Sequence, residues 1–207
     1  MELALKLASI FFTMILVDNY VLAKFLGICP FLGVSKKLDS AVGMSLAVTF
    51  VMVMATAATW PIYTYILSPE WAEGTSRDLG YLQTIVFILI IAILVQLLES
   101  ILKKYIPALY RALGVYLPLI TTNCTILGVT VLNIDNGYEF VESIVCAAGA
   151  GIGFLVAMVL FSGVRRRVEE AVTPKCFEGL PITLVAAAVT SLSFMGFGGI
   201  VESIFGA

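Results

Sequence analysis

The segment Ile85–Leu98 reads IVFILIIAILVQLL and decides the class of fold. A water-soluble helix of this length would show a polar face with a period of about 3.6 residues. This segment is instead apolar all round, with Gln96 as its one polar residue. Since about 20 apolar residues cross about 30 Å of hydrocarbon, the segment and its apolar flanks predict a membrane-spanning helix.

The composition of the whole chain agrees with a membrane protein. Of its 207 residues, 60% are apolar and 13% are charged, whereas soluble domains are about 25% charged. This composition and the net charge of −2 exclude a disordered chain, a basic nucleic-acid binder and an ordinary soluble enzyme domain. Histidine is absent, so imidazole is neither a general base nor a metal ligand here.

Six apolar blocks are long enough to span a bilayer, and no polar stretch between them is long enough for a soluble domain. The sequence therefore predicts an all-α integral membrane protein that forms a single membrane domain over residues 1–207. The predicted spans are Leu3–Val34 (overlong), Ala41–Leu67, Gly80–Leu102, Leu113–Leu132, Glu139–Val164 and Leu180–Phe205.

The basic residues predict the orientation of these spans. Nine of the twelve Lys and Arg residues lie in the connections after the first, third and fifth spans. The positive-inside rule places this side in the cytoplasm, so both termini are expected on the outer side. Aromatic residues from Trp60 to Tyr81 flank the second connection, as expected for an outer aromatic belt.

A short internal repeat divides the chain into halves. Residues 29–34 read CPFLGV and residues 124–129 read CTILGV, an offset of 95 with four of six positions identical. Three spans in each half make the second half enter the membrane from the opposite side. We therefore expect two inverted three-helix repeats, at about residues 1–102 and 103–207.

Both repeated segments are poor continuous helices. Gly27, Pro30 and Gly33 surround Cys29, while the second segment is interrupted by Pro118, Thr121, Thr122, Asn123 and Gly128 around Cys124. Freed backbone groups cannot face lipid, so such breaks are buried in protein or line a site near the midplane. Cys29 lies beyond about 20 residues of its span, so it matches the depth of Cys124 only if the first helix is broken or re-enters.

The repeat-related cysteines have three interpretations from the residues alone. They are small apolar fillers, a disulfide, or a metal half-site. Two thiolates complete neither a tetrahedral zinc site nor an iron–sulfur cluster, so a metal would take two more ligands from another chain. Cys146, outside the repeat, is expected to be a filler, and Cys176 a free thiol in a basic connection.

Three stretches carry a family resemblance that covers essentially the whole chain. They are KFLGICPFLGVSKKLDSAVGM (24–44), LYRALGVYLPLITTNCTILGVTVLN (109–133) and SLSFMGFGG (191–199). They resemble the RnfA family, membrane components of the Rnf complex, an ion-translocating ferredoxin:NAD oxidoreductase. The related NqrE family of the sodium-pumping NADH:quinone oxidoreductase shares LPLIT and the cysteines but tends to lack the CPF and LGV forms.

The resemblance implies a membrane electron-transfer subunit. It implies that Cys29 and Cys124 ligate one [2Fe–2S] cluster shared with RnfE, a paralogous partner of opposite orientation. It further implies assembly with RnfB, RnfC, RnfD and RnfG in the cytoplasmic (inner) membrane. Such a complex passes electrons from reduced ferredoxin to NAD and exports Na⁺ or H⁺.

Other features leave alternatives open. Glu99 precedes Lys103 by four residues, so it is either half of an interfacial salt bridge or a carboxylate of a cation pathway. Gly149, Gly151 and Gly153 predict close helix contacts. A small-molecule permease would explain an inverted repeat without a metal, and a purely structural membrane protein would need neither cysteine.

Overall fold

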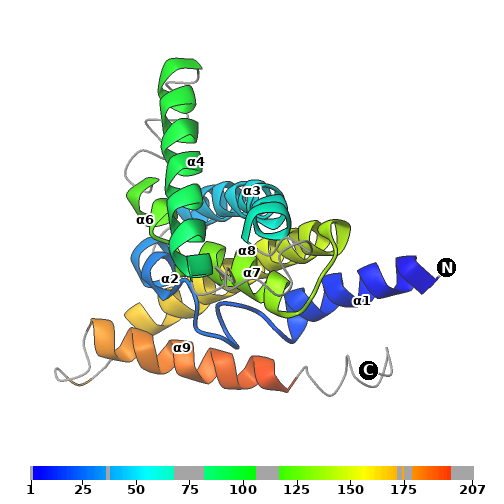
Figure 1. Cartoon of the computed structure of the whole chain (residues 1–207). Coiled ribbons are helices and arrows are strands. Elements are labelled where there is room, and N and C mark those ends of the chain that lie inside the picture. The colour runs from blue at the N-terminus through cyan, green and yellow to red at the C-terminus, as the bar shows by residue number, and fades with distance from the viewer. Residues whose placement is uncertain are drawn as a thin grey trace.

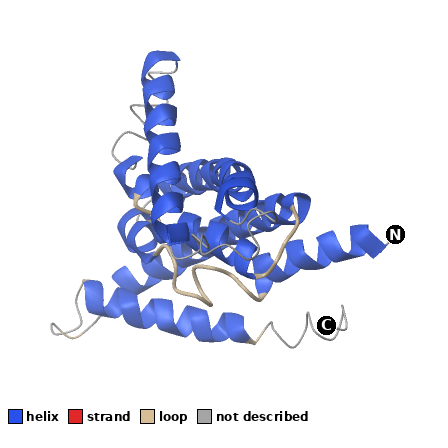
Figure 2. Ribbon diagram, viewed as in Figure 1, coloured by secondary structure: helices blue, strands red, loops and turns tan. Residues whose placement is uncertain are grey.

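The computed structural model describes residues 2–35, 38–67, 82–105, 117–171, 174 and 179–196, and all regular structure in these ranges is helical (Figure 1, Figure 2). The prediction of an all-α protein is confirmed for this part of the chain. The helices are α1 (Glu2–Leu16), α2 (Ile28–Val34), α3 (Leu38–Ile62) with the π-helical extension η1 (Tyr63–Leu67), α4 (Gln83–Tyr105), α6 (Leu117–Thr121), α7 (Cys124–Asp135), α8 (Phe140–Glu169) and α9 (Leu180–Met195).

Each of the six predicted apolar blocks contains at least one of these helices. Three described helical segments are long and apolar enough to cross a membrane: Leu38–Leu67, Gln83–Ile101 and Phe140–Glu169. The remaining blocks contain shorter apolar helices, at Ala4–Leu16, Leu119–Asp135 and Leu180–Met195. Six complete spans therefore stay a prediction, whereas the interruption of the first and fourth blocks is confirmed.

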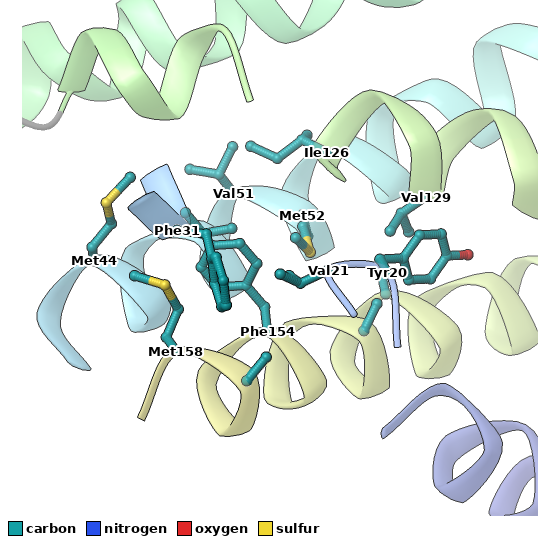
Figure 3. Close-up of a cluster of buried hydrophobic side chains, with 14 of the residues drawn as sticks. Tyr20, Val21, Phe31, Met44, Val51, Met52, Ile126, Val129, Phe154 and Met158 are labelled. Atoms are coloured by element: carbon teal, nitrogen blue, oxygen red, sulfur yellow. The ribbon is translucent and has the colours of Figure 1, made fainter. Parts of the chain in front are cut away.

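Helices α3 and α8 form the centre of the molecule, and α1 and α7 pack against them (Figure 1). Large apolar side chains of these helices and of the segment after α1 fill the core, among them Tyr20, Met52, Phe154 and Met158 (Figure 3). The outer helices differ: α4 packs against α3, α6 and α7 and extends away from the core, while α9 packs against α8.

Contacts at both ends show that α3 and α8 are antiparallel. The indole Nε1 of Trp60, near the end of α3, donates to the carbonyl oxygen of Tyr138, just before α8, at 3.0 Å. At the opposite end, Arg165 of α8 donates to the Ser35 hydroxyl just ahead of α3, at 2.8 Å. The two long central helices therefore run in opposite directions.

Glycines on two faces of α8 allow its neighbours to approach closely. A Cβ atom at Gly153 would lie 2.9 Å from the carbonyl oxygen of Met14 in α1. On another face, a Cβ at Gly151 would lie 2.5 Å from Cγ2 of Thr49 in α3. The prediction that these glycines make close helix contacts is confirmed.

Ionisable side chains in the apolar segments are paired. Lys6 Nζ lies 2.5 Å from Oε1 of Glu142, whose side chain is 5% exposed. The other carboxylate oxygen of Glu142 accepts the backbone N–H of Glu139 and so caps the start of α8. Asp18 and Lys24 form a looser and more exposed pair, at 4.0 Å. Pairing lowers the cost of keeping a charge in or near hydrocarbon.

Two glycines of α8 should respond in opposite directions to the same substitution. Gly153→Ala forces a methyl group against the Met14 carbonyl, and overpacking of this kind costs about 1–3 kcal/mol. Gly163→Ala has no atom within 4 Å of its new methyl and should stabilise the helix by up to about 1 kcal/mol. Thermal unfolding of the purified chain in detergent measures both. Equal shifts for the two variants would contradict the close contact at Gly153.

Candidate metal half-site at two helix breaks

The first helix break is organised by a buried asparagine. After α1 ends at Leu16, the chain is irregular until α2 begins at Ile28. Within this segment the Oδ1 atom of Asn19 accepts the backbone N–H groups of Val21 and Leu22, at 3.0 and 3.3 Å. Its Nδ2 atom donates to the carbonyl oxygen of Gly153 in α8, at 2.8 Å. Asn19 thus supplies hydrogen-bond partners for backbone groups that would otherwise be unsatisfied in a membrane.

The second break is shorter and is capped by Asn123. Helix α6 ends at Thr121, and α7 begins at Cys124. The Oδ1 atom of Asn123 accepts the backbone N–H of Thr125 at 3.1 Å, which is the standard N-cap hydrogen bond. Cys124 is therefore the first residue of α7, and Cys29 is the second residue of α2, so each cysteine lies in the first turn of a helix that follows a break.

The two breaks lie directly against each other. The backbone N–H of Gly27 donates to Sγ of Cys124 across 2.9 Å. Gly27 has φ +81°, and a Cβ atom there would lie 2.2 Å from Oγ1 of Thr125. From the other side, a Cβ at Gly128 would lie 2.5 Å from Cδ1 of Leu26. The first apolar block is therefore broken between α1 and α2, and the start of α2 lies beside the start of α7. Both parts of the block run in the same direction along α8, from the pair of Lys6 with Glu142 to the contact of Phe31 with Phe161.

The cysteines divide as the repeat predicts. Cys29 and Cys124 are both exposed on the surface of the chain, and both are free thiols. Cys146 is fully buried in the hydrophobic core, so its assignment as a filler is confirmed. The prediction for Cys176 lies outside the described residues.

The surroundings of Cys124 fit a sulfur-bound metal group. Both cysteines lie in the first turn of a helix, where backbone N–H groups lack intrahelical partners. The Nδ2 atom of Asn123 and the hydroxyl of Thr125 are buried and have no hydrogen-bond partner among the described residues, which leaves a spare donor on each residue that flanks Cys124 in sequence. Among the described residues, no three His, Cys, Asp or Glu side chains are placed to hold a metal ion. A metal held by these two thiols would therefore need further ligands from beyond the described residues, and the half-site stays a prediction.

Glu99 lies apart from the helix breaks in sequence. It is half-buried towards the C-terminal end of α4, a helix that packs against α6 and α7. Lys103 lies four residues later on the same helix. Neither the salt bridge with Lys103 nor a part in a cation pathway is tested by the structure, and both stay predictions.

Sequence reasoning missed how these residues are supported. It recognised Asn123 as a helix breaker, although an asparagine just ahead of an apolar run also signals an N-cap. The role of Asn19 had no local signal, because its partner Gly153 is 134 residues away. The sequence places Arg165 in the basic connection after the fifth predicted span, yet it lies within α8 and is buried.

Fold and site together define a helical membrane protein with an exposed thiol pair at two apposed helix breaks. The family model described as "Rnf-Nqr subunit, membrane protein" matches residues 7–201, and the chain belongs to this family.

Relatives agree with this assignment. The chain is 54% identical to the RnfA component of the Na(+)-translocating ferredoxin:NAD(+) oxidoreductase complex of Acetobacterium woodii, with 94% of this chain and 98% of the relative covered. It is 53% identical to the RnfA component of the ion-translocating oxidoreductase complex of Syntrophotalea carbinolica, over 90% of this chain and 93% of the relative. The corresponding protein of Serratia proteamaculans is 52% identical over 91% of this chain and 94% of its own length.

Two glycines with positive φ offer a matched test of the apposed breaks. Gly27→Ala and Gly137→Ala both place a side chain in the left-handed region, which costs about 1–2 kcal/mol. Only at Gly27 does the new methyl also collide with Thr125, so Gly27→Ala should lower the unfolding temperature clearly more. Thermal unfolding in detergent makes the comparison. A Gly137→Ala variant that loses as much stability would contradict this packing.

Proposed function

We propose that this chain is the membrane component of an ion-translocating ferredoxin:NAD oxidoreductase that contributes Cys29 and Cys124 to a [2Fe–2S] cluster. A paralogous membrane protein, corresponding to RnfE, supplies the other two ligands. The observation that carries the proposal is the exposure of two free thiols at helix breaks that contact each other. In a chain of 60% apolar residues, exposed cysteines at such breaks are expected to face a protein partner.

The donor set favours an iron–sulfur cluster over other metal groups. Thiolates are soft ligands that suit iron–sulfur clusters, and a [2Fe–2S] cluster takes four of them. When bound, such a cluster supplies one-electron transfer. The chain's own residues hold the ligands: the Gly27 N–H fixes the Cys124 sulfur, while Asn19 and Asn123 fix the two breaks. Hydrogen bonds to sulfur also set the reduction potential of such clusters.

The names of the relatives support the wider assignment. All three compared proteins are RnfA components of oxidoreductase complexes, and that of Acetobacterium woodii is named for Na⁺ translocation, ferredoxin and NAD⁺. Within this proposal the chain works with RnfB, RnfC, RnfD, RnfE and RnfG. Electrons pass from reduced ferredoxin to NAD, and Na⁺ or H⁺ is exported across the cytoplasmic membrane.

The helix arrangement supports the proposed pair of inverted three-helix repeats, at about residues 1–102 and 103–207. In each half a broken apolar segment with a cysteine precedes a long central helix, α3 or α8. A third helix then packs against that central helix, α4 against α3 and α9 against α8. The antiparallel central pair agrees with opposite orientations of the two halves.

The ends of the helices also support the proposed topology. The pair of Lys6 with Glu142 places the start of α1 beside the start of α8, at the end of the molecule where Trp60 contacts Tyr138. Arg165 lies at the other end of α8. With the arginine-rich end in the cytoplasm, the N-terminus lies outside.

Thiol labelling tests this orientation. Cysteines introduced by Gly74→Cys and Gly206→Cys should react in intact cells with a membrane-impermeant maleimide, because both positions are proposed to lie outside. The parent chain, treated in the same way, corrects for labelling of the native thiols. Labelling of Gly74→Cys only after the membrane is opened would overturn the orientation.

Replacement of the cysteines tests the function. In membranes containing the whole complex, Cys29→Ser and Cys124→Ser should each abolish one [2Fe–2S] electron paramagnetic resonance signal and ferredoxin-dependent NAD reduction. Cys146→Ser is the matched control and should leave both intact, because this thiol is buried in the core. An unchanged cluster spectrum in a Cys29→Ser, Cys124→Ser double variant would refute the assignment.

A further inference from the structure

One of three consecutive arginines at the end of α8 is buried. The side chain of Arg165 is 8% exposed, whereas that of its neighbour Arg166 is 85% exposed. A buried guanidinium is expensive unless its donors are all used in good geometry. The burial of Arg165 therefore calls for a structural reason beyond the basic charge that orients the protein in the membrane.

The guanidinium of Arg165 holds the last turn of α2. Its Nη1 atom donates to the carbonyl oxygen of Leu32 and to the hydroxyl of Ser35, the C-cap residue of α2. Its Nε atom donates to Oε1 of Glu169 at 3.0 Å, which orients the side chain. Carbonyl groups in the last turn of a helix lack intrahelical partners, so they can accept hydrogen bonds from a side chain. A cation there also interacts favourably with the negative end of the helix dipole.

A second contact one turn earlier on α8 holds the same short helix. The ring of Phe161 stacks on that of Phe31, with centroids 4.2 Å apart and planes at 23°. Helix α2 has only seven residues, and helices this short are not stable without tertiary contacts. Its position therefore depends on these contacts with α8, on its packing against α3 and α6, and on Gly27 at its start.

We infer that Arg165 is a positioning residue for Cys29: it fixes the far end of α2 and so sets the place and the accessibility of that thiol. Cys29 lies three residues before Leu32, about 4.5 Å along the helix axis, so a shift of the last turn is passed directly to the cysteine. Cys124 is carried by α7, which Asn123 caps, and it contacts α2 through the Gly27 N–H at the end of α2 remote from Arg165. The effect of Arg165 on the accessibility of the Cys29 thiol does not depend on the proposed function, whereas its effect on a [2Fe–2S] cluster rests on that function.

The first test needs no cluster. The full-length chain, treated with a chelator to remove any iron, is alkylated with a maleimide, and the rates at Cys29 and Cys124 are compared by peptide mass spectrometry. Loss of charge-assisted hydrogen bonds in Arg165→Gln should raise the ratio of the Cys29 rate to the Cys124 rate about tenfold. Arg166→Gln, the matched control, should leave the ratio at the parent value. An unchanged ratio in Arg165→Gln, or the same rise in Arg166→Gln, would overturn the inference.

The second test uses the assembled complex. Arg165→Gln should broaden the [2Fe–2S] resonance and shift the midpoint potential of the cluster. In Arg165→Lys the line width and the potential should lie nearer to the parent values, and in Arg166→Gln both should equal them. If Arg165→Gln fails to assemble, Ser35→Ala removes one acceptor and should raise the alkylation ratio in the same direction. No effect of Ser35→Ala in that case would count against the inference. A parent complex without the resonance would refute the proposed function, whereas a changed alkylation ratio would still support the role of Arg165.

Discussion

The hydrogen bond from the Gly27 N–H to the Cys124 sulfur is the contact on which the arrangement of this protein depends. It joins two helix breaks that lie 97 residues apart in sequence, one in each half of the chain. Neither break could exist alone in a membrane, because its freed backbone groups need partners that lipid does not provide. Each break therefore requires the protein around it, and together they place two thiols at one region of the surface.

Buried polar side chains carry much of this requirement. Asn19 binds two backbone N–H groups of the first break and ties it to α8. Asn123 caps the helix that carries Cys124, and Arg165 serves the opposite end of the helix that carries Cys29. In a chain so rich in apolar residues, these few polar groups determine where the backbone leaves the helical path. Apolar packing alone would not distinguish one register of the breaks from another.

The exposure of the two cysteines connects this architecture to function. A thiol used only as filler would be buried, as Cys146 is. Cys29 and Cys124 instead lie exposed in the first turns of α2 and α7, and the residues on either side of Cys124 each carry a buried donor without a partner among the described residues. In the proposed function these two thiols supply two of the four ligands of an iron–sulfur cluster, so the other two come from a partner protein.

The sequence by itself determined the helical membrane class, the two broken segments, the equivalent positions of Cys29 and Cys124 in the repeat, and the separation of Cys146 from them. These features follow from local properties: apolar length, glycine and proline in a helix, and a repeated motif. Only the tertiary structure decided that the first break contacts the start of α7, that Asn19 reaches Gly153, and that Arg165 is buried while Arg166 is exposed. These outcomes depend on contacts between residues about 100 or more positions apart. The local sequence does not distinguish the three adjacent arginines, because only the packing of α2 against α8 buries one of them.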